Sequence, residues 1–179
     1  MKEVTFLKRM AQQVKARRIL ELGTFDGTSA LAMAECLPDN GELITCEINA
    51  GLAGLARKRA SRHAHGHKVD VRTGPALDTL RHVAGPFDLT FIDADTENYV
   101  HYFHRAMELL GPSGVLLIDN MRASELVLTG GGHERDKSAA AVLELARELA
   151  SDSTLDAQLA HVRDGVMVIT SKTPAKQAP

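Results

Sequence analysis

The sequence predicts an α/β protein in which a mostly parallel sheet carries helices on both faces. Two observations support this fold class. Short apolar runs alternate with segments of helical periodicity along most of the chain. Near the C-terminus, two strand-like runs are separated only by Arg163-Asp164-Gly165, and an Asp-Gly pair is a strong hairpin signal. Because strands separated by whole helices join through right-handed crossovers, we expect a seven-stranded sheet that is parallel except for a C-terminal antiparallel hairpin.

The expected elements follow one another in a regular order. The chain begins with an amphipathic helix, Met1–Arg17, in which Phe6, Leu7, Met10 and Val14 share one face. The parallel strands are expected at Arg18–Leu22, Glu42–Glu47, Lys68–Arg72, Phe87–Asp93 and Gly114–Asp119. Apolar residues at three- and four-residue spacing predict helices at Thr28–Leu37, Ala50–His63, Ala76–Val83, Glu97–Leu110 and Lys137–Leu149. The hairpin strands are expected at Leu155–Val162 and Val166–Ser171.

Length and composition indicate one globular domain. The 179 residues are enough for one well-buried core, which we place at residues 1–172. Hydrophobic residues make up 44% and charged residues 25%, which excludes a largely disordered chain. The Pro- and Ala-rich residues 173–179 predict a disordered tail. The stretch Met121–Asp136 contains three consecutive glycines and no periodicity, which predicts a functional or mobile loop.

Charge and cysteine content exclude several classes of function. The formal net charge is −2, and a basic face able to displace the counterions of nucleic acid is not evident. No apolar run approaches the roughly 18 residues that span a bilayer, and the N-terminus lacks the apolar core of a signal peptide. Cys36 and Cys46 are too few for a disulfide framework and indicate buried thiols. We therefore expect a cytoplasmic protein that binds neither a membrane nor the nucleic acid backbone.

The first chemical motif is a glycine turn between the first strand and the following helix, in the sequence ILELGTFDGTS. Gly23 lets a ligand lie against bare backbone, and Gly27 permits a tight entry into the helix. The spacing is G-x-x-x-G, which fits a dinucleotide fingerprint poorly. Glu21, just before the turn, would repel a phosphate and suits a cation such as an amino group.

The second motif, LITCEIN, ends the next strand with Glu47, about 20 residues beyond the glycine turn. A carboxylate at this position can accept hydrogen bonds from both hydroxyls of a ribose. A glycine turn followed by an acidic strand end leaves two nucleoside cofactors open, NAD and S-adenosylmethionine. The altered glycine spacing and Glu21 favour S-adenosylmethionine.

The third motif is a pair of acidic strand ends, FIDAD and LIDN. Neighbouring parallel strands end at the same edge of a sheet, which should place Asp93, Asp119 and Asn120 close together. Two carboxylates and an amide oxygen form a hard oxygen set that suits Mg²⁺ or Ca²⁺. The alternative is that these side chains only cap the following helices.

Taken together, these motifs resemble the Mg²⁺- and S-adenosylmethionine-dependent O-methyltransferases of the catechol and caffeoyl-CoA type. The resemblance covers roughly residues 5–172 and includes RTGPALDTL and the closing VRDGVMVITSK. It implies a Rossmann-like class I methyltransferase fold. It also implies a small acceptor with a catechol-like or vicinal hydroxyl, activated by Mg²⁺, Mn²⁺ or Ca²⁺.

The resemblance assigns roles to individual residues. Glu21, Gly23 and Ser29 would contact the methionine part of the cofactor, and Glu47 the ribose. Asp93, Asp119 and Asn120 would hold the metal. The other residues expected at the cofactor are Thr24, Phe25, Ile48, Gly74, Pro75, Ala76 and Asp93, of which Gly74-Pro75-Ala76 would border the adenine.

The chain departs from the family in two places. A lysine that serves as general base commonly follows the acidic strand end, whereas this chain has Thr96. Asp93 and His133 are therefore the catalytic candidates, with His101 and His104 as further histidines that could accept a proton near pH 7. Family members also carry further helices before the first strand. Without them, the acceptor pocket would be more open or would be completed by a partner subunit in a homodimer.

Three other functions stay open at this point. A hydroxyuridine of tRNA could be the acceptor on the same scaffold, although the near-neutral charge argues against it. An NAD-dependent oxidoreductase is disfavoured by the glycine spacing. A cofactor-binding relative with weak or no turnover is suggested by Thr96. The histidines of His63–His67 resemble a metal tract, but their alternation in a loop does not direct them at one point.

Overall fold

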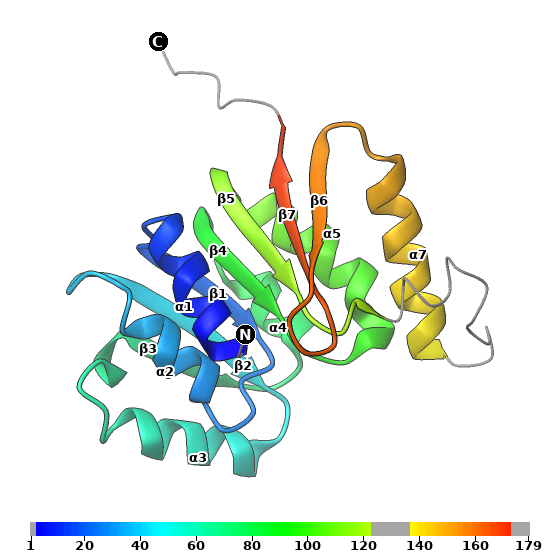
Figure 1. The fold of residues 1–179 in the computed structure, drawn as a ribbon. Coiled ribbons are helices and arrows are strands. Elements are labelled where there is room, and N and C mark those ends of the chain that lie inside the picture. The colour runs from blue at the N-terminus through cyan, green and yellow to red at the C-terminus, as the bar shows by residue number, and fades with distance from the viewer. Residues whose placement is uncertain (1–2, 123–136, 173–179) are drawn as a thin grey trace.

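A computed structural model describes residues 3–122 and 137–172 and confirms the predicted α/β architecture (Figure 1). The strands are β1 (Arg18–Leu22), β2 (Glu42–Glu47), β3 (Val69–Thr73), β4 (Phe87–Ile92), β5 (Leu110–Ile118), β6 (Leu155–Ala160) and β7 (Val166–Ser171). The α-helices are α1 (Glu3–Gln13), α2 (Thr28–Ala34), α3 (Ala50–Ala60), α4 (Ala76–His82), α5 (Tyr99–Leu109) and α7 (Lys137–Ser151). Two 3₁₀ turns are η1 (Gly66–Lys68) and η2 (Thr96–Asn98).

The strand order is β3-β2-β1-β4-β5-β7-β6. Strands β1 to β5 pair in parallel, and β7 pairs antiparallel with both β5 and β6. From β1 the chain proceeds outward through β2 and β3, and then returns to the other side of β1 with β4. The strand order therefore reverses between β1 and β4, and in open α/β sheets ligands bind at the carboxyl ends of the strands beside such a reversal.

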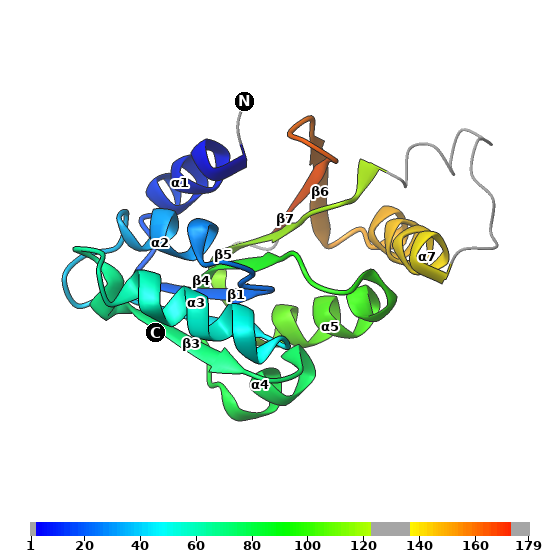
Figure 2. The same cartoon turned by 90° about the horizontal axis from the view of Figure 1, so that it is seen from below.

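Helices cover both faces of the sheet, with α1 and α2 on one face and α4 and α5 on the other (Figure 2). Successive residues of β1 contribute to different cores: Ile19 packs with α1 and α2, and Leu20 packs with α4, α5 and α7. This explains the continuous apolar runs of the central strands, because neither face of them meets water. Within the described part of the chain, no helix is both long and apolar enough to cross a bilayer.

Some boundaries differ from those predicted. Strand β5 begins at Leu110 and not at Gly114, because Leu110 pairs with Phe87 ahead of a register irregularity in β4. Gly114 fits this bend because a Cβ there would lie 2.7 Å from Cγ of Leu110. Helix α3 ends at Ala60 and not at His63, where tighter turns replace the helix. The predicted tail and most of the loop Met121–Asp136, including His133, lie outside the described residues.

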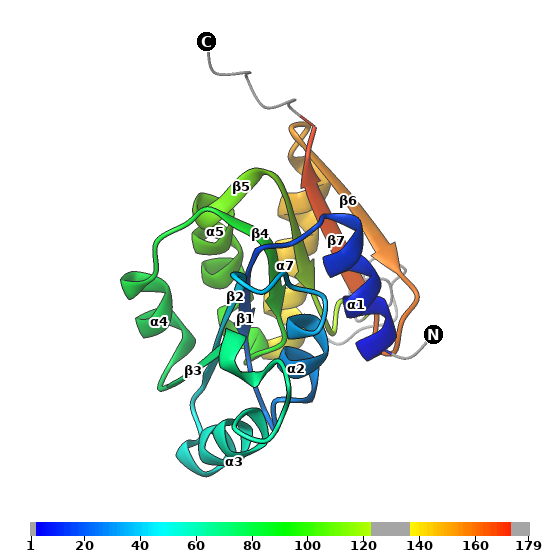
Figure 3. The ribbon, with the colours of Figure 1, turned by 90° about the vertical axis from the view of Figure 1, so that its left-hand side faces the viewer.

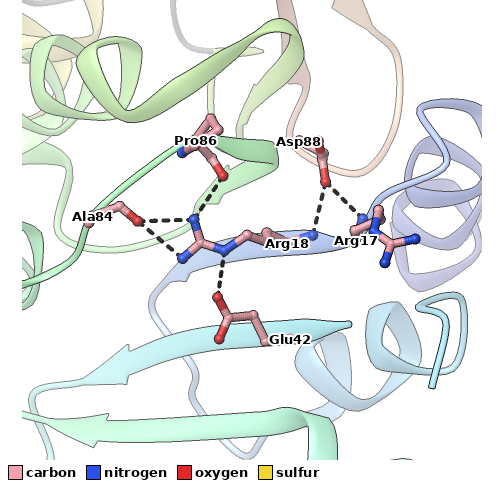
Figure 4. Close-up of polar contacts among 6 residues, drawn as sticks. All are labelled: Arg17, Arg18, Glu42, Ala84, Pro86 and Asp88. Carbon is pink, nitrogen blue, oxygen red and sulfur yellow. Dashed lines mark hydrogen bonds and ion pairs between the residues drawn. The ribbon is translucent and has the colours of Figure 1, made fainter. Parts of the chain in front are cut away.

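The amino edge of the sheet is held by Arg18 (Figure 4). Its guanidinium donates to Glu42 Oε1 at 2.5 Å and to the carbonyls of Ala84 and Pro86 at 3.1 and 2.9 Å. Asp88 of β4 accepts hydrogen bonds from the backbone amides that enter β1, including that of Arg18 at 2.9 Å. These contacts fix β1 against β2 and β4. The guanidinium nitrogens of Arg18 all donate hydrogen bonds to other residues of the chain. The opposite, carboxyl edge carries the candidate site.

Candidate active site

The glycine turn lies at the carboxyl end of β1. The backbone amides of Gly23 and Thr24 both donate to the carbonyl of Cys46 in β2, at 3.0 and 3.1 Å. Gly23 has φ of 95°, and a Cβ on it would lie 1.9 Å from the carbonyl oxygen of Asp93. Only glycine allows this approach, so the turn brings the ends of β1 and β4 into direct backbone contact.

Glu21 is fully buried behind this turn. Its Oε2 accepts a hydrogen bond from the Thr45 hydroxyl at 2.6 Å, and Thr45 in turn shares a 2.5 Å hydrogen bond with Thr24. Its Oε1 has no hydrogen-bond partner among the described residues. Burial raises the pKa of Glu21 to about 7, although the hydroxyls of Ser29 and Thr45 oppose the rise. A buried carboxyl with an unused oxygen is suited to a cationic group arriving at the turn.

Glu47 ends β2 and holds the two loops beside it. Its Oε2 accepts from the amide of Phe25 at 2.8 Å, and its Oε1 accepts from the amide of Asn49 at 2.9 Å. Phe25 has a positive φ of 48° and a largely exposed ring. Glu47, which was predicted to bind the ribose, therefore also holds the backbone of the two loops on either side of the place where a nucleoside would lie.

The acidic ends of β4 and β5 meet as the sequence predicts. Asn120 donates from Nδ2 to Asp93 Oδ1 at 3.1 Å and lies 3.5 Å from the Tyr99 hydroxyl. Asp119 is 2% exposed, and its Oδ1 has no hydrogen-bond partner within the described residues. Burial raises the pKa of Asp119 to about 7 and also raises the pKa of Asp93, each assisted by neighbouring carboxylates. The cluster is thus short of positive charge.

A third carboxylate, which the sequence analysis missed, joins this cluster. Oxygens of Glu3, Asp93 and Asp119 all lie within 4.8 Å of one another. Glu3 opens α1 and also forms an ion pair with Arg163 in the turn between β6 and β7. The sequence analysis gave Glu3 no role, because no local pattern connects it with strand ends so distant in sequence.

A cavity of about 730 Å³ connects these groups. It is lined by the predicted cofactor residues Gly23, Thr24, Phe25, Ser29, Glu47, Ile48, Gly74, Pro75, Ala76 and Asp93. Glu21 lies beneath this wall, and Asp119 and Asn120 adjoin it through Asp93. The cavity is also lined by Asp95, Asn98 and Tyr102, which were given no site role from the sequence. The Tyr102 hydroxyl donates to Asp95 Oδ1 at 2.5 Å. No local sequence pattern predicts this contact between α5 and the segment that follows β4.

Two of the three histidine candidates for a general base are not brought to this cavity. Thr96 opens η2, and neither it nor His101 or His104 of α5 belongs to the lining. His104 instead lies 3.2 Å from Glu148 of α7. The histidines of His63–His67 lie near Glu35 and Lys68 and form no metal-binding group among the described residues.

Comparison with known proteins identifies the family. A family model described as O-methyltransferase matches residues 1–172. The chain belongs to this O-methyltransferase family. The O-methyltransferase TomG from Streptomyces achromogenes, solved in complex with SAM, superposes with a TM-score of 0.86 at 30% identity, over 96% of this chain and 80% of TomG. An O-methyltransferase from Bacillus cereus in complex with SAH gives a TM-score of 0.85 at 30% identity, over 95% of this chain and 80% of that one.

Curated relatives of this O-methyltransferase include proteins named for catechol. The catechol O-methyltransferase domain-containing protein 1 of Mus musculus is 35% identical over 169 residues, which cover 92% of this chain and 64% of the mouse protein. The catechol O-methyltransferase of Niastella koreensis is 43% identical over 120 residues, which cover 65% of this chain and 54% of that protein. The chain thus spans just over half to about two thirds of the length of these relatives.

Proposed function

We propose that this O-methyltransferase transfers a methyl group from S-adenosylmethionine to a hydroxyl of a small acceptor, catechol-like or with vicinal hydroxyls, that chelates a divalent metal. The observation that carries the proposal is the meeting of Asp93, Asp119 and Asn120 beside a cavity lined by the glycine turn and Glu47. The cofactor-bound relatives support the choice of cofactor, and the relatives named for catechol support the class of acceptor.

The cofactor residues have the donors and acceptors that the cofactor requires. Glu21 offers its unused Oε1 to the amino group, next to Ser29 at the start of α2. Glu47 accepts from the ribose hydroxyls, between Phe25 and Ile48. Gly74, Pro75 and Ala76 border the adenine, where a Cβ on Gly74 would meet nothing within 4 Å.

The metal residues fit Mg²⁺ or another hard divalent cation. Asp119 Oδ1 is a buried carboxylate oxygen without a hydrogen-bond partner in the described part of the chain, and it needs either a proton or a cation nearby. Asp93 and the amide oxygen of Asn120 would complete a set of oxygen ligands. When bound, such a metal lowers the pKa of a coordinated hydroxyl. Asp93, Asp119 and Asn120 would hold that metal, and the acceptor with it, beside the cofactor, and positioning is the main source of rate for a direct displacement.

The proton of the acceptor hydroxyl needs a separate route, because Thr96 cannot accept it at neutral pH. His133 is our candidate for this base, with Asp93 as a contributor at the acceptor oxygen. We also propose that the protein is cytoplasmic, in agreement with its free cysteines Cys36 and Cys46. Following the resemblance, we propose a homodimer, which sedimentation would test.

The decisive experiment measures methyl transfer from labelled S-adenosylmethionine to a panel of vicinal-hydroxyl acceptors, with Mg²⁺ and with excess chelator. We expect turnover that chelator abolishes and that Asp119→Ala abolishes while cofactor affinity changes by no more than a few-fold. Glu42→Gln, at the opposite edge of the sheet, serves as the control and should leave turnover unchanged. Turnover that persists in chelator would refute the metal. Cofactor binding without transfer to any acceptor would favour a catalytically silent relative.

A further inference from the structure

The metal end of the cavity is closed by a contact between two segments far apart in sequence. The first turn of α1 lies beside the turn between β6 and β7 in all three views of the fold (Figures 1, 2 and 3). Glu3 from the helix and Arg163 from the turn form an ion pair there, and the Glu3 side chain is only 11% exposed. Both residues line the cavity.

The turn that carries Arg163 is anchored against the strand end of the metal cluster. Met121 and Arg122, which follow Asn120, donate their amides to the carbonyls of Gly165 and Asp164 at 2.9 and 2.7 Å. Arg163 itself has φ of 46°, a conformation that costs a side chain other than glycine free energy. A strained residue held in place by its neighbours is a reason to look for a functional contact, and here that contact is Glu3.

Charge and desolvation indicate what Glu3 does in this position. If Glu3, Asp93 and Asp119 are all ionised, one guanidinium leaves two negative charges uncompensated, which a divalent cation would balance. Among the described residues, the buried Oδ1 of Asp119 has no hydrogen-bond partner, which independently indicates that this carboxylate lacks a positive partner. The Glu3 carboxylate is therefore in a position to coordinate a divalent cation together with Asp93 and Asp119, and it is not simply an acidic group on the surface.

We propose that Glu3 is a further ligand of the divalent metal, so that metal binding ties α1 to the carboxyl edge of the sheet. Arg163 is a positioning residue that keeps the Glu3 carboxylate at the cluster while the metal is absent. The inference rests on the proposed metal site, and it goes beyond that site because it adds a ligand from the N-terminal helix.

The test is the affinity of the full chain for Mg²⁺, measured by titration calorimetry without acceptor. Glu3→Gln removes the charge and Glu3→Asp keeps the charge but withdraws the carboxylate by one methylene. A ligand role predicts that both variants weaken Mg²⁺ binding by about tenfold or more. The matched control is Glu42→Gln, which also removes the carboxylate of an Arg–Glu ion pair but at the opposite edge of the sheet, and it should change the affinity by less than about twofold.

A second measurement does not depend on affinity. Mg²⁺ should slow hydrogen exchange of the α1 amides in the wild-type chain and not in Glu3→Gln, whose fold is verified by its unfolding midpoint in chelator. Wild-type affinity in both Glu3 variants would overturn the inference and leave the proposed function standing. Loss in Glu3→Gln with wild-type affinity in Glu3→Asp would overturn it too, because charge alone would then suffice. Failure of the wild-type chain to bind any divalent cation would instead refute the metal of the proposed function.

Discussion

Both carboxylate oxygens of Glu47 bind backbone amides, one from each neighbouring loop. Glu47→Ala would remove the proposed acceptor for the ribose hydroxyls and release the Phe25 amide at the same time. We expect the affinity for S-adenosylmethionine to fall by about 1–3 kcal/mol, the usual cost of leaving polar groups unpaired. Titration calorimetry would measure the loss, with Asn49→Ala as a control that removes the side-chain cap of α3 and keeps the backbone amide that donates to Glu47. An unchanged affinity would show that the ribose does not bind at Glu47.

Glu21 makes the stability of the ligand-free protein depend on pH. Its pKa of about 7 in the folded state lies above the ordinary value of 4.5, so the unfolded chain binds fewer protons between these limits. The free energy of unfolding should therefore fall as pH rises from about 4.5 to 7, by on the order of 3 kcal/mol for this group. Glu21→Gln should remove this contribution. Denaturant titrations of both proteins at pH 5 and pH 8 would measure it, and an equal pH dependence in the two would show that Glu21 is not the group responsible.

At the scale of elements, the glycine turn depends on one close backbone contact. Gly23→Ala would push a Cβ into the carbonyl of Asp93 at a φ of 95°, and neither backbone can yield without separating β1 from β4. We expect a loss of at least about 3 kcal/mol in the free energy of unfolding. Gly54→Ala is the matched control. None of the described residues has an atom within 4 Å of a Cβ at this position of α3, so the substitution should stabilise the helix by about 0.5–1 kcal/mol. Similar stabilities for the two variants would contradict the packing argument.

The elements also show where sequence reasoning succeeds and where it stops. Patterns that lie within one element were sufficient: the apolar run ending at Ile118 predicted a parallel strand, and Arg163-Asp164-Gly165 predicted the turn of a hairpin. Asp93 and Asp119 could be brought together because parallel strands end at one edge. The start of β5 at Leu110 was missed, since Pro112 and Ser113 read as a loop when the partner strand is unknown.

At the scale of the whole molecule, contacts between segments far apart in the chain could not be predicted from the sequence. Glu3 reaches Asp93 only because α1 packs across the sheet and its first turn meets the β6–β7 turn. Tyr102 reaches Asp95 because α5 folds back along β4. Such contacts follow from tertiary packing and not from the periodicity or spacing of any local motif. The cofactor residues could be proposed because their motifs are contiguous, and the family match supports that reading.

The cluster at the carboxyl edge predicts that stability and metal binding oppose each other in the molecule as a whole. Asp119 has a pKa of about 7 in the folded state, raised by burial and by the charges of Asp93 and Glu3, so its ionised form destabilises the metal-free protein above that pH. Asp119→Asn keeps the shape and removes the charge. In chelator at pH 8 it should raise the free energy of unfolding by about 2–4 kcal/mol.

Mg²⁺ should reverse this order. A metal present at 1,000 times its dissociation constant stabilises the wild-type fold by about 4.1 kcal/mol through mass action, which exceeds the expected advantage of Asp119→Asn in chelator, whereas the variant loses a ligand and should gain little. Denaturant unfolding of both proteins, in chelator and in saturating Mg²⁺, measures the crossover, and Glu42→Gln should respond to Mg²⁺ as the wild-type chain does. A variant that is less stable than wild type in chelator would show that Asp119 is structural. The expected crossover would show that the fold tolerates a buried, unpaired carboxylate because the bound cation compensates it.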